Sequence, residues 1–453
     1  MKFHSKPVAE HAEVPLADAG HLEAVVSHWT RRESPERPAT GARNRCFVLS
    51  LSLPKQRNDL AEILGLVEAQ GDEVVGHEEH RLTRPDPRTL LGSGVAERIG
   101  TQARNVGADL LVVDAHLTPS QTRNLEDVAG IPVCDREAVI LNVFQRHAKT
   151  NRARVQVEIA HLEYLRPRIR GIGLNMDQQA GGRVKARGPG ETASELLARR
   201  LDDRLVELRR ALERVKDSDR VQRRQRSRAH RIVLVGYTNA GKTSLMNALT
   251  SATLSVRDRP FETLDTTSRC LTRHGGDVLL SDTVGFIRRM PERLFASFES
   301  TLAEVREASL LALVVDVSDP ELPLKLTTTR EMLARLGATE IPRLTVFNKL
   351  DLLAQAPAAS ALEVWSDGHP FVALTSRDPV AVAELRETLS SLARAASGTV
   401  ELFLPYDEPG RISLAYSRCR VLGVVPEEGG LRFRLEASLE VLAQISGSGR
   451  SGR

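Results

Sequence analysis

The segment 236–243, with the sequence GYTNAGKT, places two glycines, a lysine and a hydroxyl residue at the spacing of a phosphate-binding loop. Glycine at 236 and 241 lets the backbone fold around a polyphosphate without a Cβ in the way. Consecutive backbone N–H groups and the start of a helix would then face the anion. The expected nucleotide-binding residues of this loop are Gly236, Tyr237, Thr238, Asn239, Ala240, Gly241, Lys242, Thr243 and Ser244.

Two side chains of this loop would carry its chemistry. Lys242 is expected to reach the β- and γ-phosphates as a catalytic residue, and the Thr243 hydroxyl to bind Mg²⁺. The apolar run 232–235 precedes the loop, and the helical pattern 244–249 follows it. This order of strand, loop and helix is the context that a phosphate-binding loop requires.

A second polar segment, SDTVG at 281–285, follows the apolar run 278–280. In this segment Asp282 would hold Mg²⁺ through water, and the N–H of Gly285 would sense the γ-phosphate as part of the catalytic set. Thr283 and Val284 complete the expected nucleotide contacts of the segment.

The hydroxyl-rich stretch 261–269 has little apolar periodicity and fits a loop that closes on Mg²⁺ and the γ-phosphate and opens after hydrolysis. Thr263 is the residue expected to close, as a catalytic group and a metal ligand beside Thr243 and Asp282. Thr266 and Thr267 are alternatives, and an ordinary surface turn is the competing interpretation of the stretch as a whole.

The segment NKLD at 348–351 indicates which base is bound. It follows the apolar run 344–347 and so lies at the carboxyl end of a strand, where open α/β sheets bind ligands. Asn348 and Asp351 can offer an amide and a carboxylate to the guanine edge, while adenine would leave the carboxylate unpaired. With Lys349 between them, these residues predict GTP or GDP as the ligand.

The chain of 453 residues is long enough for about three domains. Its 41% hydrophobic content excludes a chain that is disordered throughout. The expected fold is α/β: a P-loop GTPase domain preceded by a small α/β domain with a helical hairpin and followed by a small α+β domain. The predicted parts are a disordered extension (1–44), an N-terminal α/β domain (45–149), a basic helical hairpin (150–228), the GTPase domain (229–395), a C-terminal α+β domain (396–445) and a flexible tail (446–453).

Within these parts, strands are expected at 47–53 and 109–114 and a helix at 60–69, with another after Pro119. The hairpin would pair helices 152–168 and 194–224 around an irregular, glycine-rich stretch at 171–190. Strand-like runs at 400–404 and 431–435 indicate the C-terminal domain.

Basic residues are concentrated around the predicted hairpin. Six arginines and no acidic residue lie between Arg220 and Arg231, and seven lysines and arginines lie between Arg146 and Arg170 against Glu158 and Glu163. Such a face could bind RNA phosphates, and a solvated helix surface is the equally weighted alternative. Four cysteines without a C-x-x-C pair argue against a disulfide framework or a zinc site. No apolar stretch is long enough to span a membrane, so a cytoplasmic protein is expected. A monomer is expected as its oligomeric state.

Together these motifs resemble those of the HflX family of translation-factor-related GTPases, in order over about 45–445. The matching segments are 236–242, 263–265, 282–287 and 348–351, with LTPSQ at 117–121, RGPGE at 187–191 and YDEPG at 406–410 outside the GTPase domain. The family's guanine-supporting element would correspond to Thr375, Ser376 and Arg377. The resemblance implies binding to the large ribosomal subunit and its RNA, GTP-dependent ribosome splitting or rescue under stress, and hydrolysis stimulated by the ribosome.

Two positions bear on how hydrolysis is achieved. Asn239 lies where several related GTPases carry a potassium-ligating Asn, so the resemblance implies K⁺ as a further cofactor; a loop-capping Asn is the alternative. Phe286 follows Gly285 where many switch GTPases place a water-orienting Gln. This predicts slow hydrolysis until a partner supplies the polar group. Alternatively Phe286 packs under the switch while Thr263 or Asp265 positions the water.

Two other functions fit the same residues. A GTPase acting in ribosome assembly or RNA modification would also need a guanine switch and a basic hairpin. An RNA-binding protein with a structural nucleotide site would show slow turnover that RNA does not change.

Overall fold

The computed structural model describes residues 43–52, 60–169, 193–225, 230–250, 267–271, 278–283, 285–395 and 397–446. The predicted extension (1–44), the glycine-rich stretch at 171–190 and the predicted tail (446–453) lie wholly or almost wholly outside these residues. The chain divides into two compact units, which are taken in turn below. The first holds Met1–Asn58 and Asp72–Cys134, and the second holds Asp59–Gly71 and Asp135–Arg453.

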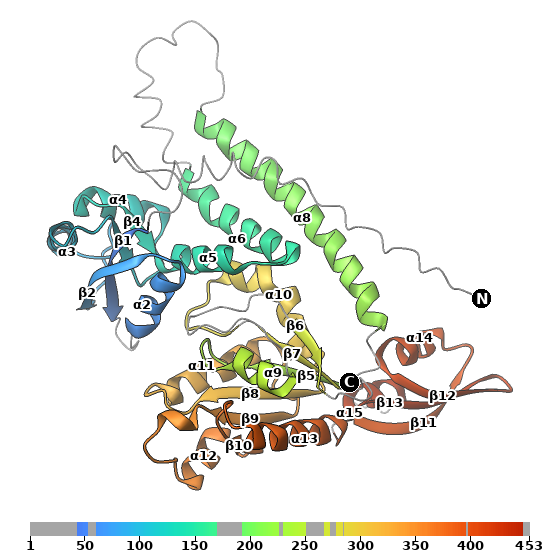
Figure 1. The fold of residues 1–453 in the computed structure, drawn as a ribbon. Helices are drawn as coiled ribbons and strands as arrows, with labels where there is room; N and C mark the ends of the chain where they lie inside the picture. Colours follow the sequence, from blue (N-terminus) through green and yellow to red (C-terminus); the bar gives the residue numbers. More distant parts are fainter. Residues whose placement is uncertain are drawn as a thin grey trace, which may run out of the picture. The chain divides into compact units, whose positions relative to one another are not determined.

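The first unit is built on a four-stranded sheet with the order β2-β1-β3-β4. Its strands are β1 (Arg45–Ser52), β2 (Glu73–Arg81), β3 (Leu110–Val113) and β4 (Val133–Asp135), and its helices are α3 (Ser93–Asn105) and α4 (Pro119–Ala129). The central strand β1 runs parallel to both β2 and β3. Phe47, Leu111, Ile99 and Leu125 share one buried core of strand and helix residues. The predicted small α/β fold is therefore confirmed (Figure 1).

Local sequence explains where α4 begins and ends. The Thr118 hydroxyl accepts the backbone N–H of Gln121, and the Gln121 side chain accepts the backbone N–H of Thr118. Pro119 occupies the first helical turn, where a missing N–H costs nothing. Gly130 ends the helix at φ 65°, in the left-handed region.

The second unit begins with four helices, α2 (Leu60–Ala69), α5 (Arg136–His147), α6 (Asn151–Ile169) and α8 (Ala193–Gln225). The helices predicted at 152–168 and 194–224 are thus present, and α6 packs against α8. Leu201, Leu205 and Leu208 are buried, as expected from their helical spacing. Ion pairs join the two helices: Arg204 lies 2.8 Å from Glu158, and Arg209 lies 2.7 Å from Glu163.

A six-stranded sheet with the order β10-β9-β8-β5-β7-β6 forms the centre of the nucleotide domain. Its strands are β5 (His230–Val235), β6 (Thr267–Cys270), β7 (Val278–Asp282), β8 (Leu310–Asp316), β9 (Arg343–Asn348) and β10 (Phe371–Ala373). All neighbours are parallel except β6 and β7. The carboxyl ends of the parallel strands therefore meet at one edge.

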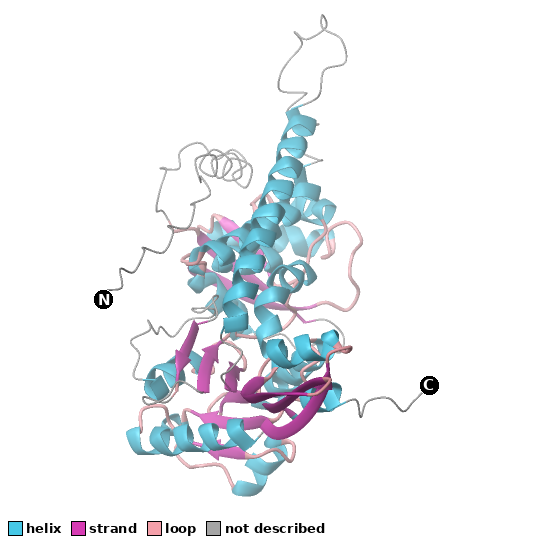
Figure 2. Cartoon of the chain, turned by 90° about the vertical axis from the view of Figure 1, so that its right-hand side faces the viewer, coloured by secondary structure: helices cyan, strands magenta, loops and turns pink. Residues whose placement is uncertain are grey.

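Helices cover both faces of this sheet, which explains why β8 is apolar along nearly its whole length. The helices are α9 (Lys242–Thr250), α10 (Glu292–Arg306), α11 (Leu322–Arg335), the short 3₁₀ helix η2 (Leu350–Leu352), α12 (Ala359–Ser366) and α13 (Pro379–Ala395). Leu245 of α9 and Leu385 of α13 lie in one core with Ile232 and Val346. Figure 2 shows the strands of this domain flanked by helices.

The C-terminal part is a three-stranded antiparallel sheet, in the order β11-β13-β12, with two helices. The elements are β11 (Ser397–Pro405), α14 (Pro409–Arg418), β12 (Arg420–Glu427), β13 (Gly430–Ser438) and α15 (Leu439–Ser446). Phe433, Leu435, Ala415 and Ile445 form its core, so the predicted small α+β fold is confirmed. Among the described residues no helix is long and apolar enough to cross a membrane.

Candidate nucleotide-binding site

The loop between β5 and α9 has a backbone that only glycine tolerates at two points. Gly236 has φ +150°, and a Cβ there would lie 2.2 Å from the carbonyl oxygen of Val314. Gly241 has φ +89°, and a Cβ there would lie 2.4 Å from Nδ2 of Asn348. Both distances are far below van der Waals contact. Asn239 also adopts a left-handed conformation, at φ 62°, which Asn tolerates better than most residues.

Lys242 is held by the loop it belongs to. Its Nζ donates to the carbonyl oxygens of Gly236 at 3.2 Å and Tyr237 at 2.9 Å, and the residue is buried. Burial lowers the pKa of Lys242 to about 8, against the opposing effect of the Asp282 carboxylate. A cation with so little water around it gains much from a phosphate, because the anion replaces lost hydration.

The residues predicted to bind Mg²⁺ meet beside this lysine. The Thr243 hydroxyl donates to Oδ2 of Asp282 at 2.7 Å, and Asp282 ends β7 with no exposed surface. A hydroxyl and a carboxylate are oxygen ligands of the kind that Mg²⁺ prefers, so these two residues fit the ion. The next residue, Thr283, instead donates to the carbonyl oxygen of Leu234 at 2.7 Å, which ties β7 to β5. Thr263 and Thr266 lie outside the described residues, and Thr267 is the first residue of β6.

The segment after β7 is joined to the phosphate-binding loop by a short backbone ladder. The Phe286 N–H donates to Gly236 at 3.0 Å, and the Thr238 N–H donates to Phe286 at 2.8 Å. Gly285 passes so close that a Cβ would lie 2.8 Å from Cα of Thr238 and 3.0 Å from Nζ of Lys242. The glycine predicted to sense the γ-phosphate is therefore beside the lysine predicted to bind the phosphates. Val284 lies outside the described residues.

Phe286 has no exposed surface. Its side chain therefore packs in the interior. A buried phenyl ring fits both interpretations of this position, so a polar group supplied by a partner and a water positioned by Thr263 or Asp265 both stay predictions; Thr263 and Asp265 lie outside the described residues.

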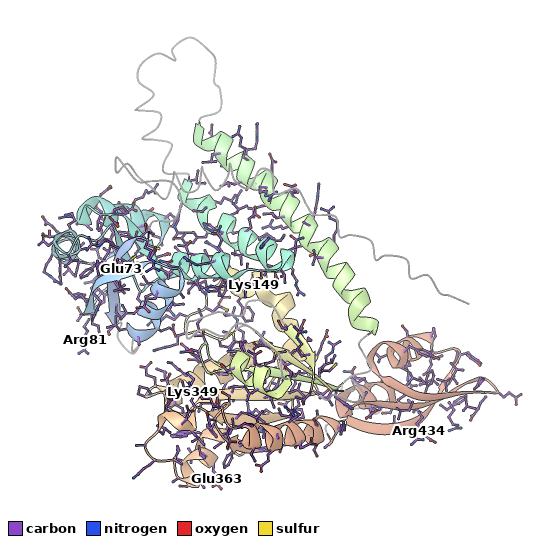
Figure 3. All side chains as sticks on the ribbon, viewed as in Figure 1. Glu73, Arg81, Lys149, Lys349, Glu363 and Arg434 are labelled. Carbon is purple, nitrogen blue, oxygen red and sulfur yellow. The ribbon has the colours of Figure 1, made fainter. Side chains whose placement is uncertain are left out.

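On the guanine side, Asn348 joins three loops. Its Nδ2 donates to the carbonyl oxygen of Ala240 at 3.1 Å, and its Oδ1 accepts the N–H of Ser376 at 3.1 Å. It therefore links the phosphate-binding loop to the segment 375–377 that follows β10. Lys349, labelled in Figure 3, has φ 66°, and its Nζ lies 2.7 Å from Oδ2 of Asp316 at the end of β8.

Asp351, the residue expected to recognise guanine, is held by its neighbours. A hydrogen bond from the Thr375 side chain lowers the pKa of Asp351, with a further contribution from Arg377. Arg377 lies 2.8 Å from the Asp351 carboxylate, and its own side chain is 80% exposed. The carboxylate is thus kept ionised, which is the form that accepts two guanine donors. Thr375 and Arg377 thus contact Asp351, and the Ser376 N–H donates to Asn348; that the three residues support guanine stays a prediction.

Some residues of the site were not found from sequence. Asp316 was missed, although its position at the carboxyl end of β8 is the same signal that revealed Asn348. The Tyr237 hydroxyl accepts the N–H of Arg288 at 3.0 Å, a contact that no local pattern predicts.

The geometry so far is that of a P-loop nucleotide hydrolase with guanine-directed side chains. Three family descriptions match successive parts of the chain: "GTP-binding GTPase N-terminal" over 57–145, "GTP-binding GTPase Middle Region" over 147–226 and "50S ribosome-binding GTPase" over 231–349.

Several relatives named "GTPase HflX" cover most of the chain. The protein from Spirochaeta thermophila is 38% identical over 87% of this chain and 97% of its own length. The protein from Caldanaerobacter subterraneus is 33% identical over 88% of this chain and 92% of its own length. The protein from Gluconacetobacter diazotrophicus is 42% identical over 75% of this chain and 74% of its own length. The chain belongs to the HflX family of GTPases, and it is a GTP-hydrolysing enzyme.

Proposed function

We propose that this GTPase binds the large ribosomal subunit and uses GTP hydrolysis to split or rescue ribosomes, as a response to stress. The observation that carries the proposal is the guanine nucleotide site of this chain within a domain whose family is described as ribosome-binding. The same proposal takes the chain as a cytoplasmic monomer, with the domain boundaries predicted from the sequence.

Hydrolysis in this proposal uses the residues of the site in named roles. Thr243, Asp282 and Thr263 hold Mg²⁺, which neutralises charge on the β- and γ-phosphates when it is bound. Lys242 binds the same phosphates, and the Gly285 N–H meets the γ-phosphate. Asn348, Asp351 and the segment 375–377 select guanine. The contacts of Thr243, Asp282, Asn348 and Asp351 support their roles, whereas the role of Thr263 rests on the family resemblance of its segment.

In this proposal the hairpin supplies the RNA contact through its exposed arginines. Within the basic run 146–170, the partly buried Arg168 pairs with Asp135 at 3.0 Å, and the exposed Arg146 donates to the Gln70 carbonyl at 2.6 Å. Other exposed arginines lie at positions 154 and 166 of α6 and at positions 200, 210 and 214 of α8. Phosphate binding through α8 should make the affinity fall with salt.

The deciding experiment measures GTP turnover with and without purified large subunits, together with co-sedimentation. The proposal predicts binding to mature large subunits, faster turnover in their presence and loss of light scattering when whole ribosomes are split with GTP. Preferential co-sedimentation with subunit precursors or with tRNA would replace it with a role in assembly or RNA modification. Turnover that no ribosomal particle changes would indicate a structural nucleotide site.

A further inference from the structure

We infer that Arg136, on the first turn of α5 and outside the nucleotide-binding motifs, is a positioning residue for GTP hydrolysis. Its Nη2 donates to the carbonyl oxygen of Arg288 at 2.9 Å. Arg288 follows the segment that carries Gly285 and Phe286, so Arg136 holds the end of that segment.

The peptide groups of Arg288 are held on both sides. Its N–H donates to the Tyr237 hydroxyl at 3.0 Å, and its carbonyl accepts from Arg136. The Phe286 peptide is already joined to Gly236 and Thr238. The chain from Phe286 to Arg288 therefore has little freedom, and it sets where the Gly285 N–H lies. A shift of about 1 Å in such a group can reduce catalysis about a hundredfold.

The Arg136 side chain is fixed by burial and by an ion pair. Its side chain is 6% exposed and pairs with Glu62 of α2, whose side chain is 3% exposed. A planar guanidinium can bridge a carboxylate and a carbonyl with one fixed geometry, which an ammonium group cannot reproduce. The neighbouring residue adds a second attachment, because the buried Glu137 lies 3.6 Å from Arg293 near the start of α10. The first turn of α5 thus holds both ends of the stretch from 288 to 293.

The same turn of α5 is fixed by the hairpin helix α6. Asp135 caps α5 by accepting the Ala138 N–H at 2.9 Å, and it also accepts from the Tyr164 hydroxyl at 2.9 Å and from Arg168 at 3.0 Å. The Arg168 guanidinium stacks on the Tyr164 ring at 3.5 Å. Asp135 and Arg136 are consecutive, so a movement of the last turns of α6 would reach the Arg288 carbonyl through one peptide unit. This coupling rests on the proposed ribosomal function, whereas the positioning role does not.

The first test compares Arg136→Lys with Arg146→Lys, a matched control at the other end of α5 that contacts Gln70. Arg136→Lys keeps a charge beside Glu62 but loses the bridging geometry. We expect its basal kcat for GTP to fall about five- to tenfold. Its affinity for fluorescent GDP should change less than about twofold, because GDP has no γ-phosphate for Gly285 to meet. Arg146→Lys should keep the wild-type kcat.

Wild-type kcat in Arg136→Lys would overturn the inference. So would an equal loss of kcat in both variants, or a loss of GDP affinity that parallels a fall in Tm, since either result indicates a purely structural role. If Arg136→Lys fails to fold, the double variant Glu62→Gln with Arg136→Gln removes the guanidinium without leaving its buried partner charged. A folded double variant with normal kcat and normal GDP affinity would then overturn the inference.

The second test is a double-mutant cycle between Tyr164→Phe and Arg136→Lys, read as the stimulation of turnover by saturating large subunits. Coupling predicts that Tyr164→Phe reduces stimulation in the wild-type background and has no further effect beside Arg136→Lys. Additive effects would contradict the coupling. Absence of any stimulation in the wild-type protein would contradict the proposed function instead, and the basal effect of Arg136→Lys would still decide the positioning role.

Discussion

The two ends of the nucleotide site are built in different ways. At the guanine end, Asn348 is tied to Ala240 and Ser376, and Asp351 to Arg377, all from loops of one sheet edge. At the γ-phosphate end, the backbone ladder of Phe286 is supplemented by Arg136, which belongs to a helix before the hairpin. The residues proposed to recognise the base are therefore joined to one another within the nucleotide domain, whereas the segment proposed to meet the γ-phosphate is also held by a helix that precedes the hairpin.

This difference has a physical consequence. Binding a base requires only that the site be complementary to a rigid ring. The base site can therefore keep one conformation throughout the reaction. Hydrolysis requires a segment that approaches the γ-phosphate and later leaves it. A segment held from outside the nucleotide domain can respond to whatever moves the outside contact. The comparison thus predicts that substitutions at the guanine end alter the affinity for every guanine nucleotide. Substitutions at the γ-phosphate end should alter turnover alone.

The largest loss of turnover is expected from changes in the phosphate-binding loop, which contacts both Asn348 at the guanine end and Phe286 at the γ-phosphate end. Lys242→Ala and Thr243→Ala should each reduce GTP turnover by at least about a hundredfold, the first through lost phosphate charge and the second through lost Mg²⁺. Thr243→Ser is the control, because it keeps the hydroxyl. Steady-state phosphate release measures all three variants. Normal turnover in Lys242→Ala would show that this loop is not the catalytic one.

Phe286→Gln tests whether the catalytic end lacks only a polar side chain. Because Phe286 is fully buried, we expect the change to lower the free energy of unfolding by about 3 kcal/mol or more and to leave basal turnover low. Thermal unfolding and basal turnover are the measurements, with Phe286→Leu as an apolar control. A stable Phe286→Gln protein with raised basal turnover would restore the idea of a missing water-orienting Gln.

Asp351→Asn should affect the guanine end alone. An amide in place of the carboxylate leaves at least one guanine donor unpaired, which costs about 1–3 kcal/mol in affinity for GTP and GDP alike. Affinity for xanthosine nucleotides should rise, because xanthine presents the complementary pattern. Competition with a fluorescent nucleotide measures both. Unchanged GTP affinity would remove the assignment of this residue to the base.

Potassium should act at the catalytic end. If an amide oxygen of Asn239 helps to bind K⁺ near the phosphates, turnover in KCl should exceed that in NaCl at equal ionic strength by about tenfold. The ion would offset charge that develops during hydrolysis. Asn239→Ala should abolish the difference. The same turnover in both salts, or a response that survives in Asn239→Ala, would leave Asn239 as a loop residue with a left-handed backbone.

The smallest effect concerns pH. With its pKa lowered to about 8, Lys242 of the free protein loses its proton as the pH rises through that value. Bound phosphate favours the charged form, so nucleotide binding should take up a proton near pH 8.5, and affinity should fall by at most about tenfold per pH unit. Calorimetry in buffers of different ionisation enthalpy detects this uptake. Binding without proton exchange at that pH would contradict the lowered pKa.

The sequence alone determined the local chemistry of this protein. Glycine at 236 and 241, Lys242 and Thr243 stand in one continuous strand, loop and helix, so their proposed roles could be argued from spacing alone. The segments at 282–285 and 348–351 follow apolar strands of a parallel sheet, and that placement brings their side chains to one edge. The helices of the hairpin were also predictable, because their apolar periodicity is sustained over several turns.

The tertiary structure decided which residues contact one another across distant parts of the sequence. Asp316 pairs with Lys349, and Arg136 reaches Arg288, because the fold brings together segments that are distant in the chain. The spacing of apolar residues along the sequence does not predict such contacts. Burial decided a further question: Phe286 is an interior side chain, whereas Arg146 and the arginines at positions 200, 210 and 214 of α8 are exposed. A sequence shows that a side chain is apolar or charged, but only packing decides whether it meets water or a neighbour.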